Sequence, residues 1–280
     1  MKSELDTSTL SYRDKMAIEE YERLSPRLLY EIIRQDGIEE LTRPTKALIF
    51  SGITAGLVVT FSFVFKAIFT AYLPKESWSP LVTNMGYTVG FLLVILGRMQ
   101  LFTENTITTV VPLFNPLTWR KVTAVARLWS IVFVSNLVGT ALAALFLQNH
   151  QAFNPEFVNA MHEIAMHVKH MTISENILKG IPAGILIASI VWMMPSVNSG
   201  KFIMIFFFIY LIALGDFAHV IVGSAEIAYL VFQGEASLYD YFITFLLPTC
   251  FGNILGGTVV FTMMIYGQVN QEIEIQAKNK

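Results

Sequence analysis

An aspartate and a histidine stand inside an apolar run, in the stretch "ALGDFAHVIVG" at residues 213–223. Asp216 carries a carboxylate at neutral pH, and the imidazole of His219, with a reference pKa of about 6.5, can donate or accept a proton there. Ionisable groups are costly inside a membrane, so those that occur there face a watery cavity or pair with one another. The stretch therefore indicates a polar break in a membrane segment, where a proton could be exchanged.

The composition of the whole chain agrees with a membrane setting. Its 280 residues are 54% hydrophobic and only 14% charged, whereas soluble domains carry about 25% charged residues. The net charge of −2 indicates neither nucleic acid nor an anionic membrane surface as a partner, and the single cysteine, Cys250, excludes a disulfide framework. The polar start of the chain also excludes a cleaved signal peptide. We therefore expect an all-α polytopic membrane protein.

Six apolar segments can each contribute a membrane crossing, because roughly 20 helical residues span the hydrocarbon core. Two of them are interrupted, the second by "GRMQLFTENT" and the fifth by "GDFAH", so we expect broken helices there. The expected organisation is an N-terminal head over 1–46, a six-segment transmembrane pore domain over 47–268 and a tail over 269–280. The second segment begins near 81 and stops at "GRMQLFTENT", and the others cover about 47–72, 122–147, 177–194, 202–233 and 241–267.

The head contains one amphipathic helix with recognisable ends. In "SPRLLYEIIRQDG", Ser25 is the expected N-cap, Pro26 takes the first helical position and Gly37 lies past the end. The apolar residues that share one face are Leu28, Leu29, Ile32 and Ile33. This pattern predicts a helix that lies on the protein or on the bilayer.

Lysine and arginine are distributed unequally among the loops, and these residues are enriched on the cytoplasmic side of membrane proteins. The head, the tail and the loops after segments two and four hold thirteen of them. The opposite loops hold only Lys75 and Lys169. We therefore expect a multi-pass protein of the cell inner (plasma) membrane with both termini in the cytoplasm.

An internal repeat relates the two halves of the membrane domain. "SNLVGTALAALF" at 135–146 resembles "GNILGGTVVFTM" at 252–263, so that Asn136 and Gly139 match Asn253 and Gly256, 117 residues later. A similar shift aligns "LFT" at 101–103 with "FAH" at 217–219. Two halves of three segments each insert with opposite topology, and inverted repeats with matched breaks indicate a transport site. Half-helices that begin at such breaks present positive N-termini, which favour an anion.

Simpler structural explanations exist for several of these residues. His219 could pack between helices and bond to a backbone carbonyl, and the glycines could serve only close helix packing. Asp216 could cap the second half of the broken segment or compensate Arg98, which lies near the equivalent break. Two carboxylates near the breaks could bond to free backbone N–H groups or to neighbouring protomers: Glu104 and Glu226. Cations that can snorkel towards water are Lys66, Arg127 and Lys179.

Metal and enzyme chemistry find little support. The loop 148–171 holds four histidines, and His167 and His170 lie about one helical turn apart, a spacing that could bind a metal. With no cysteine or firm carboxylate partner nearby, a solvated face is the better interpretation, so we expect no metal and no cofactor. An intramembrane hydrolase would need a nucleophile beside a base. Ser224 follows His219 by five residues, on the wrong side of a helix.

Taken in order, "LFTENT", "SNLVGT", "FAH" and "GNILGG" resemble the formate/nitrite transporter family over about residues 40–268. The resemblance implies an aquaporin-like six-helix protomer with inverted three-helix repeats and broken second and fifth membrane helices. It also implies a homopentamer with one pore per protomer. The solutes would be small monovalent anions or their weak acids, of the formate, nitrite or hydrosulfide type.

The same resemblance assigns roles to individual residues. His219 would be the central pore histidine and Thr103 the threonine opposite it. The remaining path residues would be Leu101 and Phe102 on the same loop, Tyr87 and Phe91 at one apolar constriction, Ile212 at the other, and Lys169 in a vestibule. Formate channels commonly read "FEHS" followed by asparagine, and many members have a pore asparagine at the place of Gly184. Here the corresponding residues are Ala218, Val220 and Gly223.

The sequence thus predicts a membrane channel or transporter in which His219 is a candidate proton donor to a passing weak-acid anion. An anion that enters an apolar pore loses hydration at a large cost, and it avoids that cost by crossing as the neutral acid. Two alternatives stay open. One is a channel for a small neutral solute, and the other is a non-conducting structural membrane protein of the same fold.

Overall fold

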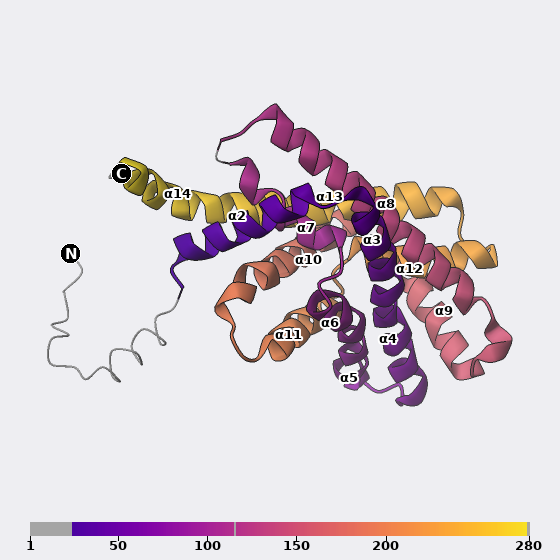
Figure 1. Ribbon diagram of the computed structural model, residues 1–280. Helices are drawn as coiled ribbons and strands as arrows, with labels where there is room; N and C mark the ends of the chain where they lie inside the picture. The colour runs from indigo at the N-terminus through magenta and orange to yellow at the C-terminus, as the bar shows by residue number, and fades with distance from the viewer. Residues whose placement is uncertain (1–23, 115, 279–280) are drawn as a thin grey trace, which may run out of the picture.

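The computed structural model describes residues 24–114 and 116–278, and all regular structure within these ranges is helical. Figure 1 shows the helices gathered into one bundle, with α2 and α14 side by side at one end and α9 at the opposite end. The first half contains α2 (Pro26–Thr42), α3 (Thr45–Val59), α4 (Phe61–Tyr72), α5 (Ser79–Gly86), α6 (Thr88–Leu96), α7 (Phe102–Thr108), η2 (Val111–Leu113) and α8 (Trp119–Leu147). The second half contains η3 (His150–Ala152), α9 (Pro155–Lys169), α10 (Ile173–Met193), η4 (Met194–Ser196), α11 (Lys201–Leu214), α12 (Val220–Gln233), η5 (Asp240–Leu246), α13 (Leu247–Ile254), η6 (Leu255–Thr262) and α14 (Met263–Lys278).

Within the residues that the structure describes, five continuous helical stretches are long and apolar enough to cross a membrane. These are Thr45–Tyr72, Ser79–Leu96, Trp119–Leu147, Ile173–Ser196 and Asp240–Gln271. The remaining predicted segment consists of two shorter apolar helices, α11 and α12, separated by a break. The second segment is also broken, because its chain leaves the helix after α6 and resumes as α7. The prediction of six segments with broken second and fifth helices is therefore confirmed.

The two halves use the same close helix crossing. Helix α3 packs along α8, and α10 packs along α13 and η6. A Cβ atom on Gly139 would collide with the backbone oxygen of Ile53, and one on Gly256 would collide with that of Ile181. Both glycines of the repeat are thus required because two backbones approach closely, and the inverted repeat is present in space as well as in sequence.

The amphipathic helix α2 lies on the protein and is longer than predicted. Ser25 caps it as expected, because its Oγ accepts from the Leu28 N–H at 3.3 Å. The expectation that the helix ends before Gly37 is wrong. Gly37 lies within the helix, where a Cβ atom would collide with the Thr108 backbone oxygen and the Pro112 ring. The glycine therefore allows α2 to press against the end of α7 and against η2.

The loop 148–171 contains a helix that the sequence analysis interpreted as a solvated face. Asn154 caps α9 by accepting from the Glu156 N–H at 3.1 Å, and Pro155 takes the first turn. Its buried residues are Phe157, Ala160, Met161, Ile164 and Ala165. This apolar stripe packs on α4 and α12, so α9 forms a cover over one end of the bundle.

Candidate functional site

The two breaks have the same backbone geometry. Each follows a glycine and contains a non-glycine residue in the left-handed region, Arg98 with φ 51° and Asp216 with φ 52°. Side chains rarely adopt such angles, and strained residues of this kind persist where the surrounding structure holds them in place. Helix α7 then begins at Phe102 and α12 begins at Val220.

Asn136 holds the first break in place. Its Oδ1 accepts from the Phe102 N–H at 2.9 Å, and its Nδ2 donates to the carbonyl oxygens of Gln100 and Gly52, each at 2.8 Å. The amide therefore joins the start of α7 to α3, and it satisfies the Gln100 carbonyl and the Phe102 N–H, which have no helical partner. It is fully buried.

Asn253 does the same at the second break. Its Oδ1 accepts from the Val220 N–H at 3.0 Å, and its Nδ2 donates to the carbonyl oxygens of Ala218 and Gly180, each at 2.9 Å. The two asparagines that the sequence repeat paired are thus equivalent in their hydrogen bonds. Each one connects a broken helix to a continuous neighbouring helix.

These bonds correct the alignment of the breaks. Phe102 occupies the position of Val220, so residues at the breaks correspond with a shift of 118. Leu101 is then the equivalent of His219, and both are N-cap residues. The sequence analysis matched "LFT" with "FAH", which is wrong by two residues. That alignment was based on similar side chains. The correct alignment matches the first residue of each half-helix, Phe102 with Val220.

Thr103 and His219 meet where the two half-helices begin. The Thr103 Oγ1 lies 2.8 Å from the His219 Nε2, and the two residues are only 1% and 2% exposed. The other ring nitrogen, Nδ1, accepts from the Val222 N–H at 3.3 Å and so caps α12. Because Nδ1 is an acceptor, the neutral ring carries its hydrogen on Nε2 and donates it to Thr103. The threonine hydroxyl hydrogen then remains available to a third group.

Apolar side chains enclose this pair. The ring of Phe91 meets that of His219 edge-on, with centroids 4.8 Å apart, and Tyr87 lies 5.6 Å from Phe91. Leu101 is also buried, and it lines a cavity different from the one that Tyr87 and His219 line. These aromatic and aliphatic contacts leave the pair with almost no exposed surface.

A cavity of about 540 Å³, the α9 vestibule, reaches His219 from one end of the bundle. Tyr87 and Phe217 line it together with the acidic residues Glu163, Asp216 and Glu226. It also contains Lys66, His167, Thr83 and Asn84. Asn84 was not singled out in the sequence, and Lys66 was interpreted only as a snorkelling residue.

Asp216 does not take either of the roles predicted for it. Its carboxylate pairs with the Lys179 ammonium at 2.5 Å and with the His167 Nε2 at 3.0 Å. The cap of α12 is provided by His219 instead, and Arg98 lies in the cavity at the opposite end. Asp216 therefore connects its break to α9 and α10, at the rim of the α9 vestibule.

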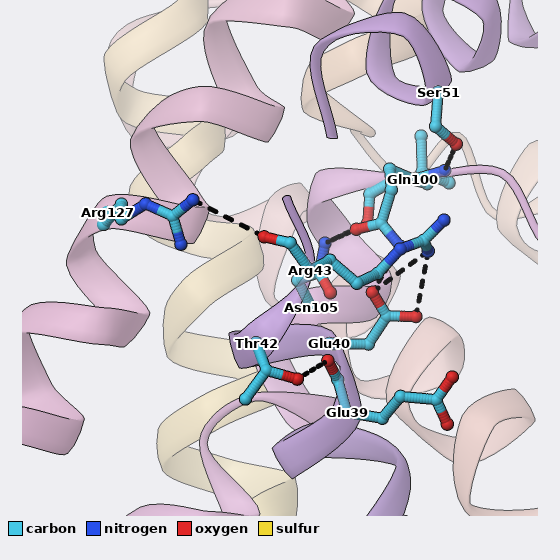
Figure 2. A network of polar contacts seen from close by, with 9 residues as sticks. Glu39, Glu40, Thr42, Arg43, Ser51, Gln100, Asn105 and Arg127 are labelled. Carbon is cyan, nitrogen blue, oxygen red and sulfur yellow. Dashed lines mark hydrogen bonds and ion pairs between the residues drawn. The ribbon is translucent and has the colours of Figure 1, made fainter. Parts of the chain in front are cut away.

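A second cavity of about 470 Å³, the α2 vestibule, approaches the pair from the other end. Leu101 forms part of its wall, with Glu104, Arg98 and Gln100. Figure 2 shows the polar network beside it, in which Glu40 of α2 accepts from the Gln100 amide at 2.7 Å. Glu40 also pairs with Arg43 at 3.2 Å, and the Ser51 hydroxyl accepts from the Gln100 N–H at 3.0 Å. The first break is thus tied to both α2 and α3.

Titratable groups on α2 respond to their surroundings. Burial raises the pKa of the Asp36 carboxyl at the α2 vestibule, and the positive charge of Arg98 opposes that shift. The hydrogen bond from Arg34 lowers the pKa of Glu31. Burial raises the pKa of Tyr30 to about 12, so its hydroxyl stays protonated and donates to the Val111 carbonyl at 3.3 Å.

Several predicted path residues lie elsewhere. Phe102 packs on α8, with its ring 4.7 Å from that of Phe133. Ile212 is fully buried at the end of α11 and lines neither vestibule. Lys169 donates to the Glu235 carbonyl at 2.5 Å and does not line the α9 vestibule. The structure therefore brings Thr103, His219, Tyr87, Phe91 and Leu101 together and leaves the other three outside.

Two positions where the sequence departs from formate channels are packing positions. A Cβ atom on Gly184 would collide with the Asn253 backbone oxygen, and one on Gly223 would collide with the ring of Phe245. Three of the four histidines of 148–171 contact protein groups: His162 contacts Glu235 at 2.6 Å, His150 contacts Tyr229 at 3.0 Å and His167 contacts Asp216 at 3.0 Å. Within 24–114 and 116–278, no cluster of three potential metal ligands occurs.

Comparison with known proteins gives consistent matches. A family model described as formate/nitrite transporter matches residues 27–267. The chain is 42% identical over 266 residues to the inner membrane protein YfdC of Escherichia coli strain K12, covering 94% of this chain and 86% of that one. The fold matches an FNT family ion channel with a TM-score of 0.73 at 18% identity, over 87% of this chain and 98% of that chain. It also matches a pentameric formate channel with formate bound, with a TM-score of 0.68 at 19% identity, over 81% and 98% of the two chains.

Proposed function

The chain belongs to the formate/nitrite transporter family, and from that premise we propose that it conducts small monovalent anions or their weak acids across a membrane, through one pore in each protomer. The observation that carries the proposal is the buried contact between Thr103 and His219. This contact lies between a vestibule at either end of the bundle.

The helix termini support an anion at this place. Because Thr103 lies in the first turn of α7 and His219 caps α12, the N-termini of both half-helices meet at the pair. Helix N-termini carry partial positive charge, which stabilises a nearby anion. The Thr103 hydroxyl hydrogen, free to donate, gives the anion a direct hydrogen bond.

The apolar enclosure supports a proton transfer. A bare anion between Phe91 and Leu101 would lose its hydration at a cost of several kcal/mol, whereas the neutral acid would not. A proton that enters His219 at Nδ1 makes an imidazolium. Its Nε2 hydrogen passes to the Thr103 oxygen while the hydroxyl hydrogen forms the new O–H bond of the acid. This transfer requires Nδ1 to release the Val222 N–H, so proton transfer is coupled to the cap of α12.

The assembly and orientation belong to the same proposal. The solved relative is named a pentameric channel and the curated relative an inner membrane protein, so we assign this chain to a homopentamer in the inner membrane. The distribution of lysine and arginine supports an orientation with both termini in the cytoplasm. On this assignment, 1–46 and 269–280 are cytoplasmic and 47–268 forms the pore. The α9 vestibule then faces outwards, and the protein is a transporter rather than an enzyme.

Uptake into sealed liposomes tests the proposal. Purified protein is reconstituted, and the influx of formate, nitrite and hydrosulfide is compared with that of glycerol and urea and with empty liposomes. We expect influx of at least one of the anions, increasing as the outside pH falls, and no influx of the neutral solutes. Influx of glycerol or urea alone would support the neutral-solute alternative. No influx of any solute would support a non-conducting protein.

A further inference from the structure

A phenylalanine of the sixth membrane segment forms part of the wall beside His219. Phe245 lies in η5, and it lines the same cavity as His219, Gly223 and Glu226 of α12. The three α12 residues are spaced by four and three positions, so they share one face of the helix. Gly223, the middle one, is therefore a gap in the row of side chains that α12 turns towards the cavity.

The ring of Phe245 occupies the space that Gly223 leaves open. A Cβ atom on Gly223 would lie 2.3 Å from the ring Cζ and 2.7 Å from Cε2, and the three closest atoms all belong to Phe245. Glycine inside a helix is less favourable than alanine, so the close approach of the ring explains this glycine. The tip of the ring thus lies against the α12 backbone, about 6 Å along the helix from His219.

The surrounding helices hold the ring at this place. η5 packs directly on α12, and it is π-helical, a rare conformation that frequently occurs at functional sites. Helix α12 also packs on α8, where the Thr140 Oγ1 lies 2.9 Å from the Ser224 Oγ. Phe245 is almost fully buried. Because α12 is packed against both α8 and η5, the ring and the glycine backbone cannot separate unless a membrane helix moves.

A fixed ring beside His219 is suited to limiting the size of a solute, because it has no hydrogen-bonding group and acts through its volume. Resting on the proposed function, we propose that Phe245 is a specificity-determining residue. It admits a one-carbon or similarly small anion to His219 and excludes anions with an added methyl group. A close-fitting apolar pocket distinguishes substrates that differ by one methylene group by about 10–200-fold. Acetate, which has one methyl group more than formate, should therefore pass much more slowly.

The test compares acetate influx with formate influx in liposomes that contain the parent, Phe245→Ala or Phe63→Ala. Phe63 is the matched control, because its ring is also fully buried but lines neither vestibule. The ratio of acetate to formate influx should rise about tenfold or more in Phe245→Ala, and less in the milder Phe245→Leu. Phe63→Ala should keep the ratio of the parent, even if less protein folds. An unchanged ratio in both Phe245 variants would overturn the inference and would leave the roles of Thr103 and His219 intact.

A second measurement does not depend on flux. Cys250→Ala removes the single thiol of the chain. In that background, Ala218→Cys places a thiol on the cavity wall next to His219, and Glu163→Cys places one at an exposed position of the same cavity. A water-soluble methanethiosulfonate reagent should label Ala218→Cys faster when Phe245→Leu is also present, and it should label Glu163→Cys at the same rate. Equal labelling of Ala218→Cys with and without Phe245→Leu would overturn the inference even if the parent conducts no anion.

Discussion

The imidazole of His219 makes two hydrogen bonds that serve different functions. His219 caps α12 through Nδ1 and donates to Thr103 through Nε2. A helix-packing histidine, the simpler interpretation of the sequence, would bond to a backbone carbonyl. The observed ring instead accepts from a backbone N–H and points its proton at a hydroxyl between two cavities. This geometry is suited to relaying a proton. Because Nδ1 also accepts from the Val222 N–H, a proton that binds at Nδ1 breaks the cap of α12.

Replacing Thr103 with valine should reduce anion flux about tenfold, because the hydroxyl that links His219 to the solute contributes about 1–1.5 kcal/mol. The side-chain volume is kept, so the pentamer should stay folded. Flux into liposomes per folded pentamer measures the effect. Thr54→Val is the matched control, since the Thr54 hydroxyl is exposed and bonds only within α3. Equal flux in the two variants would remove Thr103 from the path.

Some features of the helices and their breaks can be predicted from the sequence, and others cannot. The breaks, the close helix crossings and the equivalence of Asn136 and Asn253 could be predicted, because small residues and buried amides leave a visible pattern in apolar segments. The residue-by-residue alignment of the two breaks could not be predicted, because the backbone turn before each half-helix determines it. The close approach of Phe245 to Gly223 depends on packing between distant helices, which no local pattern contains. Helix α9 escaped notice because its stripe is short and mixed with histidines.

Replacing Asn253 with leucine should destabilise the protein strongly. The change leaves the Val220 N–H and the Ala218 carbonyl buried without a partner, at a cost of about 1–3 kcal/mol each, and also removes the bond to Gly180 of α10. Thermal unfolding in detergent should therefore begin at a clearly lower temperature. Asn149→Leu, at an exposed position with one local bond to Phe146, should unfold as the parent does. Identical unfolding of the two variants would show that Asn253 does not hold the break in place.

Helix α2 contributes a pH dependence of known sign. Burial raises the folded-state pKa of Asp36, so its contribution to stability is present at low pH and is lost as the pH rises through that value. Asp36→Asn should therefore raise the unfolding temperature slightly at pH 7 and leave it nearly unchanged at pH 4. Melting curves at the two pH values measure this. A lower unfolding temperature at pH 7 would mean that the positive charge of Arg98 stabilises the Asp36 carboxylate more than burial destabilises it.

At the scale of the whole molecule, the inverted repeat explains why there is a vestibule at each end. The two halves have opposite topology, so their breaks meet inside the bundle, and each break opens towards its own side of the membrane. The bundle also exposes large apolar side chains along α8, including Val134, Leu142 and Phe146. Such a surface contacts either lipid or another protomer.

We expect the protein to form a pentamer in mild detergent. Native mass spectrometry should give a mass five times that of the 31.5 kDa chain. Leu142→Lys on the exposed face of α8 tests whether that face lies between protomers, because a lysine there would weaken a buried contact but could snorkel from a lipid-facing position. A stable monomer or tetramer of the parent would contradict the proposed assembly.

If an anion takes up a proton at His219 and crosses as the neutral acid, formate influx and lumen pH recorded at the same time should change together. His219→Asn is the decisive variant, since asparagine can still cap α12 but cannot titrate. In liposomes that contain the parent protein, an inward formate gradient should acidify the lumen in step with influx. The variant should keep its pentamer and show about tenfold less influx and acidification. Equal influx and acidification in both proteins at every pH would contradict the account.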